Sequence, residues 1–583
     1  TRLYHLAKDK LKITLDDTPG DRYAGQVLGE LEFNVLKELG ATATMQEALT
    51  TRAIRQAQLT TGEAGRPAMF NDLRRRLQMV GIQAELQDGR LMFHFAPPAG
   101  DTLKLARPQP HPWLSEHLLE VVGVIPANDS SGLPAGDFIR LVEANEQLRR
   151  MLASQVPERL VREAETRLQA ALNAFCAALL PPEILRLRER QLFSGRAVLA
   201  PGVGLRYDQI GLPESICWQL FGAQVGAELG DGTPVSVDNP RAVAVLDAVL
   251  AHSWLTINRA MTFSSTALLA FHPVRDPGRA IRLNPILCRW MNADFDGDQV
   301  AFYLPLSEAT QQEAAELLSV AGQLTHNPAL ASTLLPPPEV TWGLAWRSLT
   351  SEGRSEIASI AGVPEEALGP LLTQAGISDL LKRVRERDGV TGMLELLQRL
   401  AEVGYTAAQA AGASLSPFIQ MDSERPPAPA GDDPQRWELY SEQLAEKIFS
   451  STAYHDEKIG PQLLDARARA WNRNSLVMVA GVRGVATDVY GKPFIVRHNY
   501  AEGFTPEEMY ACVVGARQGF AQLHVENEKM IQEIKKQAEP VGLSVLARAR
   551  RARHPGIVFA RAAANGEVDR LEDLDSRLMV GLA

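Results

Sequence analysis

The chain has 583 residues, of which 45% are hydrophobic and 22% charged, and its formal net charge at pH 7 is −10. These values are ordinary for a soluble globular protein of roughly three to five domains. The acidic balance excludes a protein that coats nucleic acid through bulk positive charge, and it leaves local basic patches possible.

Membrane, secretion and cysteine signals are weak in this sequence. No run of 18 or more apolar residues occurs and no signal-like head follows Thr1, so we predict neither a transmembrane helix nor secretion. The absence of an initiator Met suggests that the natural start lies upstream. The four cysteines form no C-x-x-C pair, which predicts no zinc site and no disulfide framework and fits the cytoplasm: Cys176, Cys217, Cys288 and Cys512.

The first third of the chain carries two clear structural patterns. Residues 71–95, NDLRRRLQMVGIQAELQDGRLMFHF, predict a helix and then a β-hairpin with Asp88-Gly89 at the turn. From Asp137 to Phe175, apolar residues recur at spacings of three and four, with Pro157 between the two runs. This pattern predicts an antiparallel helical hairpin with charged outer faces.

The rest of the chain alternates between strand-like and helix-like patterns. Residues 193–305 predict a β domain, because short apolar runs alternate with Gly and Pro, and a helix at about 241–252 interrupts it. Residues 308–450 are helical in pattern. Thr505, Pro506 and Glu508 then mark the start of a helix of about 30 residues. We expect the final basic and acidic runs after residue 547 to be solvated surface.

Three aspartates, Asp294, Asp296 and Asp298, alternate in the stretch MNADFDGDQVA (291–301). An EF-hand loop is excluded, because Gly297 would fall at its position 4 and Pro305 at its position 12. A solvated acidic turn is the simple alternative, but apolar strand-like flanks would anchor the loop in a core. Gly297 allows a tight turn that aims alternating carboxylates at one point. The pattern therefore favours Mg²⁺, with a second ion arriving with a nucleotide, as in phosphoryl or nucleotidyl transfer.

The octapeptide NADFDGDQ (292–299) resembles the metal-binding loop of the largest, beta-prime subunit of multisubunit DNA-dependent RNA polymerases. The likeness extends in the family's order over roughly residues 110–525. Before the aspartates the matching stretches are LLEVVGVIPA (118–127), DFIRLVEANEQLRRML, PERLVREAETRLQAALNAF, LFSGRAVLAPGVGLRYDQIGLPESICWQLF and INRAMTFSSTALLAFHPV. After them come PLSEATQQEAAELL, LQRLAEVGYTAAQAAGASLS (397–416), NSLVMVAGVRG (474–484) and EGFTPEEMYACVVGARQGFA (502–521).

The resemblance implies an α+β multidomain protein. Its catalytic core would be a double-psi β-barrel, with a helical clamp before it and a pore or funnel region and a long bridge helix after it. The implied boundaries are a divergent N-terminal region (1–107), a clamp-like helical hairpin (108–190), the barrel (191–310), a helical pore- or funnel-like region (311–450), an F-loop-like segment with the bridge helix (451–540) and a C-terminal tail (541–583).

Site roles also follow from the resemblance. Asp294, Asp296 and Asp298 would hold the catalytic Mg²⁺, and a second Mg²⁺ would arrive with the nucleoside triphosphate. By the same likeness, Asn292 and Arg259 would read the incoming ribose, Arg483 would contact the substrate phosphates, and Arg190 and Arg196 would contact the nucleic-acid backbone.

The implied activity is Mg²⁺-dependent addition of nucleoside triphosphates to an RNA 3′ end by a DNA-directed RNA polymerase. A beta-like subunit is the implied partner, together with alpha-like and sigma-like factors, a DNA template and the RNA product. No membrane is involved in this interpretation.

Departures from the family keep a second hypothesis open. Met261 replaces the proline of the family's N-R-A-P-T stretch, and Leu523 and His524 replace a small Thr-Ala pair in the bridge. No stretch resembles the trigger loop or the N-terminal zinc ribbon. The alternative is a catalytically degenerate beta-prime paralogue that binds polymerase subunits or nucleic acid. A single-chain polymerase with two barrels is disfavoured, because only one such block occurs.

Overall fold

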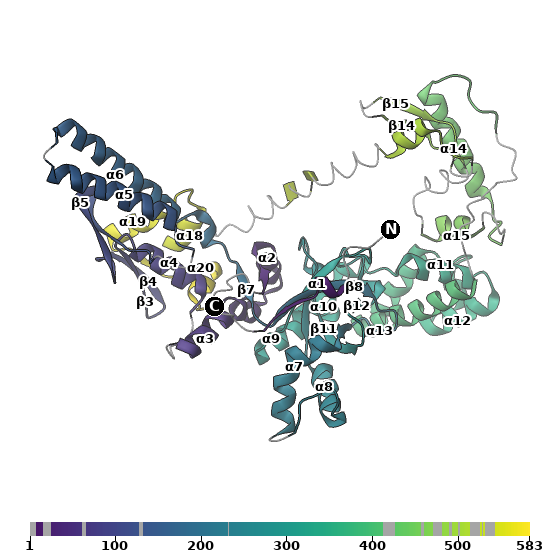
Figure 1. The fold of residues 1–583 in the computed structure, drawn as a ribbon. Helices are drawn as coiled ribbons and strands as arrows, with labels where there is room; N and C mark the ends of the chain where they lie inside the picture. Colours follow the sequence, from purple (N-terminus) through teal and green to yellow (C-terminus); the bar gives the residue numbers. More distant parts are fainter. Residues whose placement is uncertain are drawn as a thin grey trace.

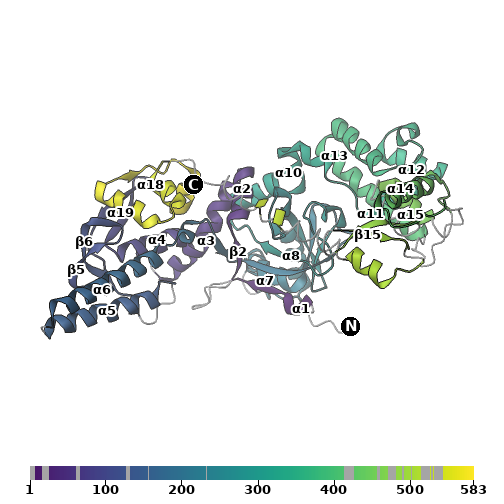
Figure 2. The ribbon, with the colours of Figure 1, turned by 90° about the horizontal axis from the view of Figure 1, so that it is seen from above.

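The computed structural model describes residues 7–15, 25–60, 66–126, 132–154, 156–230, 233–411, 426–455, 460–469, 481–488, 492–499, 502–513, 525–526, 529–530 and 543–583. Figures 1 and 2 show a β-rich centre with a helix-and-sheet body on one side and a helical body on the other. The chain is thus a mixed α and β protein.

Six strands close into a barrel at the centre. The pairing order is β8-β12-β9-β11-β10-β13, and β13 pairs back onto β8 to complete the ring. The short strand β1 joins the edge of β8 outside the ring. The strands are β1 (Lys12–Thr14), β8 (Ser194–Pro201), β9 (Gln209–Pro213), β10 (Leu255–Asn258), β11 (Leu268–Asp276), β12 (Ile281–Leu283) and β13 (Gln299–Tyr303). The predicted β domain over 193–305 is confirmed.

Side chains from alternating strand positions fill the barrel. Ala197, Ile257, Phe271 and Phe302 are all completely buried. Gly195 on β8 is required by this packing, because an added Cβ would lie 2.2 Å from Phe302 Cζ and 2.3 Å from the Lys12 carbonyl oxygen. The close contact explains the glycine of the Ser-Gly-Arg segment.

Two helices interrupt the barrel strands between β9 and β10. Helix α7 (Glu214–Leu229) follows β9 directly, and α8 (Pro240–His252) matches the helix expected at about 241–252. Asn239 caps α8 by accepting a hydrogen bond from the Arg241 backbone N–H at 3.1 Å. The helix prediction is therefore confirmed.

The N-terminal body combines helices with two antiparallel hairpins. Asp88 and Gly89 both have positive φ (49° and 71°) at the turn between β3 and β4, as the Asp-Gly pair predicted. Helix α1 (Ala7–Lys10) contacts β8 of the barrel. The elements of the N-terminal body are β2 (Gln26–Leu28), α2 (Glu30–Leu39), α3 (Thr42–Thr60), α4 (Ala68–Gln78), β3 (Ile82–Gln87), β4 (Arg90–Phe95), β5 (Thr102–His111), β6 (Leu114–Gly123) and β7 (Glu189–Gln191).

The predicted helical hairpin is present as α5 (Ala135–Ala153) and α6 (Glu158–Leu179), followed by a short 3-10 turn at Pro182–Leu185. Among the described residues, Glu158–Leu185 is one helical segment long and apolar enough to cross a membrane, by length and composition alone. In this structure its apolar residues Leu168, Leu172 and Phe175 are fully buried, and Phe175 packs on Phe138 of α5. Packing against α5 therefore accounts for this apolar face.

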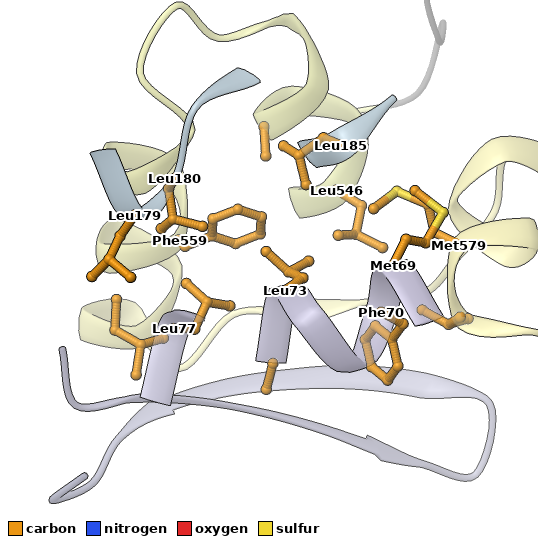
Figure 3. Close-up of a cluster of buried hydrophobic side chains, with 14 of the residues drawn as sticks. Met69, Phe70, Leu73, Leu77, Leu179, Leu180, Leu185, Leu546, Phe559 and Met579 are labelled. Carbon is orange, nitrogen blue, oxygen red and sulfur yellow. The ribbon is translucent and has the colours of Figure 1, made fainter. Parts of the chain in front are cut away.

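The C-terminal segment corrects a second expectation. It was expected to be solvated surface, but it folds onto the N-terminal body as α18 (Val545–Arg551), α19 (Pro555–Asn565), β16 (Val568–Asp569) and α20 (Leu574–Val580). Figure 3 shows Leu546 and Phe559 near Leu73 of α4 and Met579 beside Met69 of the same helix, and Leu73 and the three C-terminal side chains are nearly or fully buried. Strand β16 also pairs with β4. The basic run alternates Arg with apolar residues, so its charge suggested an exposed segment although Val545, Leu546, Ala547 and Ala549 form a buried face.

The remaining described residues are mostly helical, as predicted for 308–450. They form α9 (Glu308–Glu313), a π-helical turn (Ala314–Leu318), α10 (Val320–His326), α11 (Pro338–Arg347), α12 (Ser351–Ala361), α13 (Gln374–Ala411, kinked at Gly389), α14 (Pro434–Ser450) and α15 (Gly460–Arg469). Short 3-10 turns lie at Ser265–Ala267, Pro285–Leu287, Pro328–Ser332 and Glu365–Leu368. Strands β14 (Gly484–Thr487) and β15 (Pro493–Val496) pair beside α14.

The start of the expected long helix is present. Residues 506–513 are helical. The Thr505 backbone N–H donates to Glu508 Oε2 at 2.9 Å, and the Glu508 backbone N–H donates to Thr505 Oγ1 at 3.3 Å. This is the capping arrangement that the spacing predicted. Most of the segment expected to continue this helix to about residue 540 lies outside the described residues.

Candidate metal centre on the barrel

The aspartate loop, residues 292–298, leads into strand β13 of the barrel. Its start is fixed from the preceding turn, where Asn284 caps Pro285–Leu287 and the Ala293 backbone N–H donates to the Cys288 carbonyl at 2.8 Å. Its end is fixed by the Leu199 backbone N–H, which donates to the Asp298 carbonyl at 2.8 Å. Asn292 (φ 48°) and Gly297 (φ 125°) supply the two turns between these anchors.

The three carboxylates converge. One oxygen from each of Asp294, Asp296 and Asp298 lies within 4.8 Å of the others, with Asp294 and Asp296 exposed and Asp298 half-buried. At the usual metal–oxygen distance, oxygen ligands of an octahedral Mg²⁺ are about 3.0 Å apart when adjacent and about 4.2 Å apart when opposite. Rotation of the exposed Asp294 and Asp296 side chains would bring the oxygens to these spacings, so the donor set fits Mg²⁺.

Repulsion within the group affects its protonation. A hydrogen bond with Asp294, and then the negative charge of Asp294, raise the pKa of Asp296 above its usual range. Backbone N–H groups offset part of this repulsion, because Asp296 N donates to Asp294 Oδ1 at 3.3 Å and Asp294 N donates to Asp298 Oδ2 at 3.2 Å. A bound cation would remove the repulsion that remains.

Arg259 lies beside this group of carboxylates. Its Nε and Nη2 donate to Asp298 Oδ2 at 3.1 and 2.9 Å, and its Nη1 donates to the Ala260 carbonyl at 2.8 Å. The guanidinium therefore contacts one of the predicted metal ligands directly. Asn292 is exposed on the same loop, two residues before Asp294.

The other predicted contact residues lie elsewhere. Arg196 is exposed on β8. Arg190, on β7, is half-buried and donates from Nη1 to the Gly25 carbonyl at 3.0 Å, so part of its donor capacity is used within the chain. Arg483 precedes β14, in the small sheet that Figure 1 shows apart from the barrel.

A polar network beneath the Arg259 loop was missed by sequence reasoning. Glu32 on α2 accepts hydrogen bonds from Asn258 and Thr262, which flank Arg259. Outside residues 71–95, the first 107 residues gave few signals, and nothing in the spacing of Glu32 links it to a strand more than 200 positions away. A capping pattern for α2 was the only local sign, since Glu32 also accepts from the Gly29 backbone N–H.

Comparison with known proteins places this site in a family context. A family model described as RNA polymerase Rpb1, domain 2, matches residues 237–320, which contain α8, β10 to β13 and the aspartate loop. The beta-prime subunit of DNA-directed RNA polymerase from Dehalococcoides mccartyi is 25% identical over 66% of this chain and 38% of that protein. The subunit from Treponema pallidum is 24% identical over 87% of this chain and 44% of that protein.

A third relative, the beta-prime subunit from a Thermoanaerobacter species, is 22% identical over 69% of this chain and 45% of that protein. The chain spans less than half the length of each of these curated relatives. The family match and the relatives together support a beta-prime-like subunit: this chain is similar to beta-prime subunits of DNA-directed RNA polymerase over 66–87% of its length.

Proposed function

We propose that this chain is a catalytic subunit of a DNA-directed RNA polymerase that adds nucleoside triphosphates to an RNA 3′ end. The convergence of Asp294, Asp296 and Asp298 at the entry to β13, inside the matched range, carries this proposal. Three oxygen ligands in one exposed cluster suit Mg²⁺ shared with substrate phosphates, and a second ion would arrive with the nucleotide.

The chain's own residues would do the following. The three aspartates hold the ion at the barrel mouth, where, when bound, it supplies positive charge to the attacking 3′-oxygen and the phosphates. Arg259 and Asn292 both precede Asp298 in the chain, and they would orient the ribose hydroxyls. Because Arg259 donates to Asp298 Oδ2, ion and guanidinium share one carboxylate.

The outlying arginines keep their implied roles as part of this proposal. Arg196 would contact the nucleic-acid backbone from the surface of β8, and Arg190 would contribute less because it is engaged with Gly25. Arg483 would reach the substrate phosphates only if the β14–β15 sheet lies against the barrel in the working assembly.

The proposed architecture follows the same family likeness. The closed ring would be a double-psi β-barrel (191–310), α5 and α6 a clamp-like hairpin (108–190), and residues 311–450 a pore or funnel. Residues 451–540 would hold the F-loop-like segment and the bridge helix. The N-terminal region (1–107) and the C-terminal segment (541–583) would be the first and last parts of this chain. A beta-like subunit would complete the site, alpha-like and sigma-like factors would join it, and the cytoplasm would be its location.

A primed RNA–DNA scaffold tests this function. The chain, purified with the subunits that accompany it, should extend the RNA primer in Mg²⁺ and stop doing so when Mg²⁺ is chelated. Asp296→Ala should lower the rate by at least about a thousandfold, because a lost ligand weakens charge stabilisation in the transition state. Equal extension by the variant would refute the site.

A catalytically degenerate paralogue is the second candidate. The observation that favours it is the changed bridge sequence, with Leu523 and His524 where the family has a small pair. A complete, correctly assembled complex that binds the scaffold but never extends the primer would support this alternative.

A further inference from the structure

A buried carboxylate lies beneath the loop that carries Arg259. Glu32 on α2 is 9% exposed, and three donors converge on it. Its Oε1 lies 3.1 Å from Asn258 Nδ2 and 2.7 Å from Thr262 Oγ1, and its Oε2 accepts from the Gly29 backbone N–H at 2.8 Å. Burial of a carboxyl group costs less free energy when its oxygens are hydrogen-bonded in this way.

The two side-chain donors stand at the two ends of a short loop. Asn258 is the last residue of β10 and is 3% exposed, and Thr262 is 1% exposed. The Thr262 hydroxyl also lies 2.8 Å from Asn258 Oδ1, so the loop ends contact each other as well as Glu32. The loop of residues 258–262 is therefore attached to α2 at both ends.

Arg259 is the residue that this attachment controls. Its backbone N–H donates to the Ala267 carbonyl at 3.0 Å, and its guanidinium reaches Asp298 from the first position after β10. A shift of the loop ends would move the guanidinium away from Asp298 Oδ2, because hydrogen-bond energy falls steeply with distance and angle.

We propose that Glu32 is a positioning residue of the barrel site: it fixes residues 258–262 so that Arg259 is aimed at Asp298. It acts from a helix outside the barrel, 226 positions before Asn258 in the chain. This inference rests on the proposed function only in taking Asp298 as a metal ligand. Arg259 and a metal ion then compete for Asp298 Oδ2, and Glu32 sets the strength of that competition.

The carboxylate is better suited to this role than an amide. Glu32 accepts from all three donors, whereas a glutamine would have to present its own N–H groups to at least one of them. Glu32→Gln should therefore have an effect between those of the wild type and Glu32→Ala. A graded series of this kind is expected of a hydrogen-bonded anchor.

Hydrogen exchange of the full chain without metal tests the anchoring itself. Glu32→Ala should speed amide exchange across residues 258–268 about tenfold, because the loop loses hydrogen bonds to a charged acceptor. Glu313→Ala is the matched control, since that carboxylate also accepts from three donors, the Ala43 and Thr44 backbone N–H groups and Thr44 Oγ1, on α3. Unchanged exchange over 258–268 in Glu32→Ala, or equal acceleration in the control, would overturn the inference.

Mn²⁺ binding, followed by electron paramagnetic resonance, tests whether Glu32 acts through Arg259. Arg259→Ala should tighten Mn²⁺ binding about tenfold by removing a competing positive charge. Glu32→Ala should tighten it in the wild-type background and change it by less than about twofold in the Arg259→Ala background. Equal effects in both backgrounds would contradict a role through Arg259.

The two measurements separate the two proposals. If the wild-type chain shows no Mn²⁺ binding that Asp296→Ala abolishes, the proposed metal site fails. Hydrogen exchange would then still decide whether Glu32 positions the Arg259 loop.

Discussion

Asp575 and the aspartate loop hold carboxylates in opposite ways. Asp575 is 6% exposed and lies between Lys37, whose Nζ is 3.0 Å from its Oδ1, and Arg550. Burial opposes its ionised form, but the charges of Arg550 and Lys37 outweigh burial and hold the pKa of Asp575 below its usual range. In the loop, the one paired guanidinium, that of Arg259, contacts Asp298, and a hydrogen bond with Asp294 together with the charge of Asp294 raises the pKa of Asp296.

The difference in the number of paired cations distinguishes a structural carboxylate from a candidate ion-binding group. Asp575 has its cations inside the protein and joins α2, α18 and α20. Among the described residues, the aspartate loop has three carboxylates and one paired guanidinium, that of Arg259, so a bound cation would offset its excess negative charge. A carboxylate cluster that lacks enough internal partners is therefore a better candidate for an ion site than one that is already paired.

The largest expected effect on stability comes from breaking the paired carboxylate. Asp575→Ala should lower the free energy of unfolding by about 3 kcal/mol, because it leaves Lys37 and the mostly buried Arg550 without their shared partner. Urea denaturation measures this change. Mn²⁺ affinity should stay the same, and a loss of affinity would show that the two regions are coupled.

At the aspartate loop, we expect a substitution to lower metal affinity strongly and to change stability little. Asp298→Ala should weaken Mn²⁺ or Mg²⁺ binding about a hundredfold, since it removes the carboxylate that is nearest to Arg259 and least exposed of the three. The free energy of unfolding should change by less than about 1 kcal/mol, because relief of the repulsion among the three carboxylates offsets the lost hydrogen bonds from Arg259 and the Asp294 backbone N–H. Calorimetric metal titration and urea denaturation of one preparation would give both values. A large loss of stability would mean that the cluster is structural.

Acidification should remove the stability that Asp575 contributes through its pairs with Lys37 and Arg550. Because the folded-state pKa of Asp575 is lowered, its contribution is complete above the ordinary pKa of an aspartate, about 4, and is lost as the pH falls through the folded value. Urea midpoints measured from pH 6 downward should fall more steeply below about pH 4 in the wild type than in Asp575→Asn. Parallel curves would indicate that Asp575 does not contribute.

The smallest effect is expected at Arg196, an exposed residue of β8. Arg196→Ala should leave stability and metal affinity unchanged and weaken scaffold binding uniformly across sequences, lowering the salt slope by about 1. Fluorescence anisotropy at several salt concentrations measures this slope. An unchanged slope would remove Arg196 from the nucleic-acid contacts.

Features with a local sequence signal could be predicted. The Asp88-Gly89 turn, the α5–α6 hairpin, α8 and the Thr505–Glu508 cap all depend on residues within a few positions of one another. The convergence of the three aspartates was also local, since Gly297 lies within the same short loop.

Features that depend on contacts between distant parts of the chain could not be predicted from the sequence. The packing of Leu546 and Phe559 onto α4 joins parts of the chain separated by most of its length, and an alternating basic run does not reveal which face is buried. The contact of Glu32 with Asn258 spans 226 positions. Such partners are set by how the helices and the barrel pack, which the spacing of residues within each segment does not encode.

Cleavage of the chain by Fe²⁺ in place of Mg²⁺ would test the central claim most directly, because hydroxyl radicals cut the backbone next to the bound ion. We predict cuts within residues 292–299 that are suppressed by excess Mg²⁺ and absent in Asp296→Ala. Cuts confined to other segments, or an unchanged pattern in the variant, would contradict the assignment of the aspartate loop as the metal site.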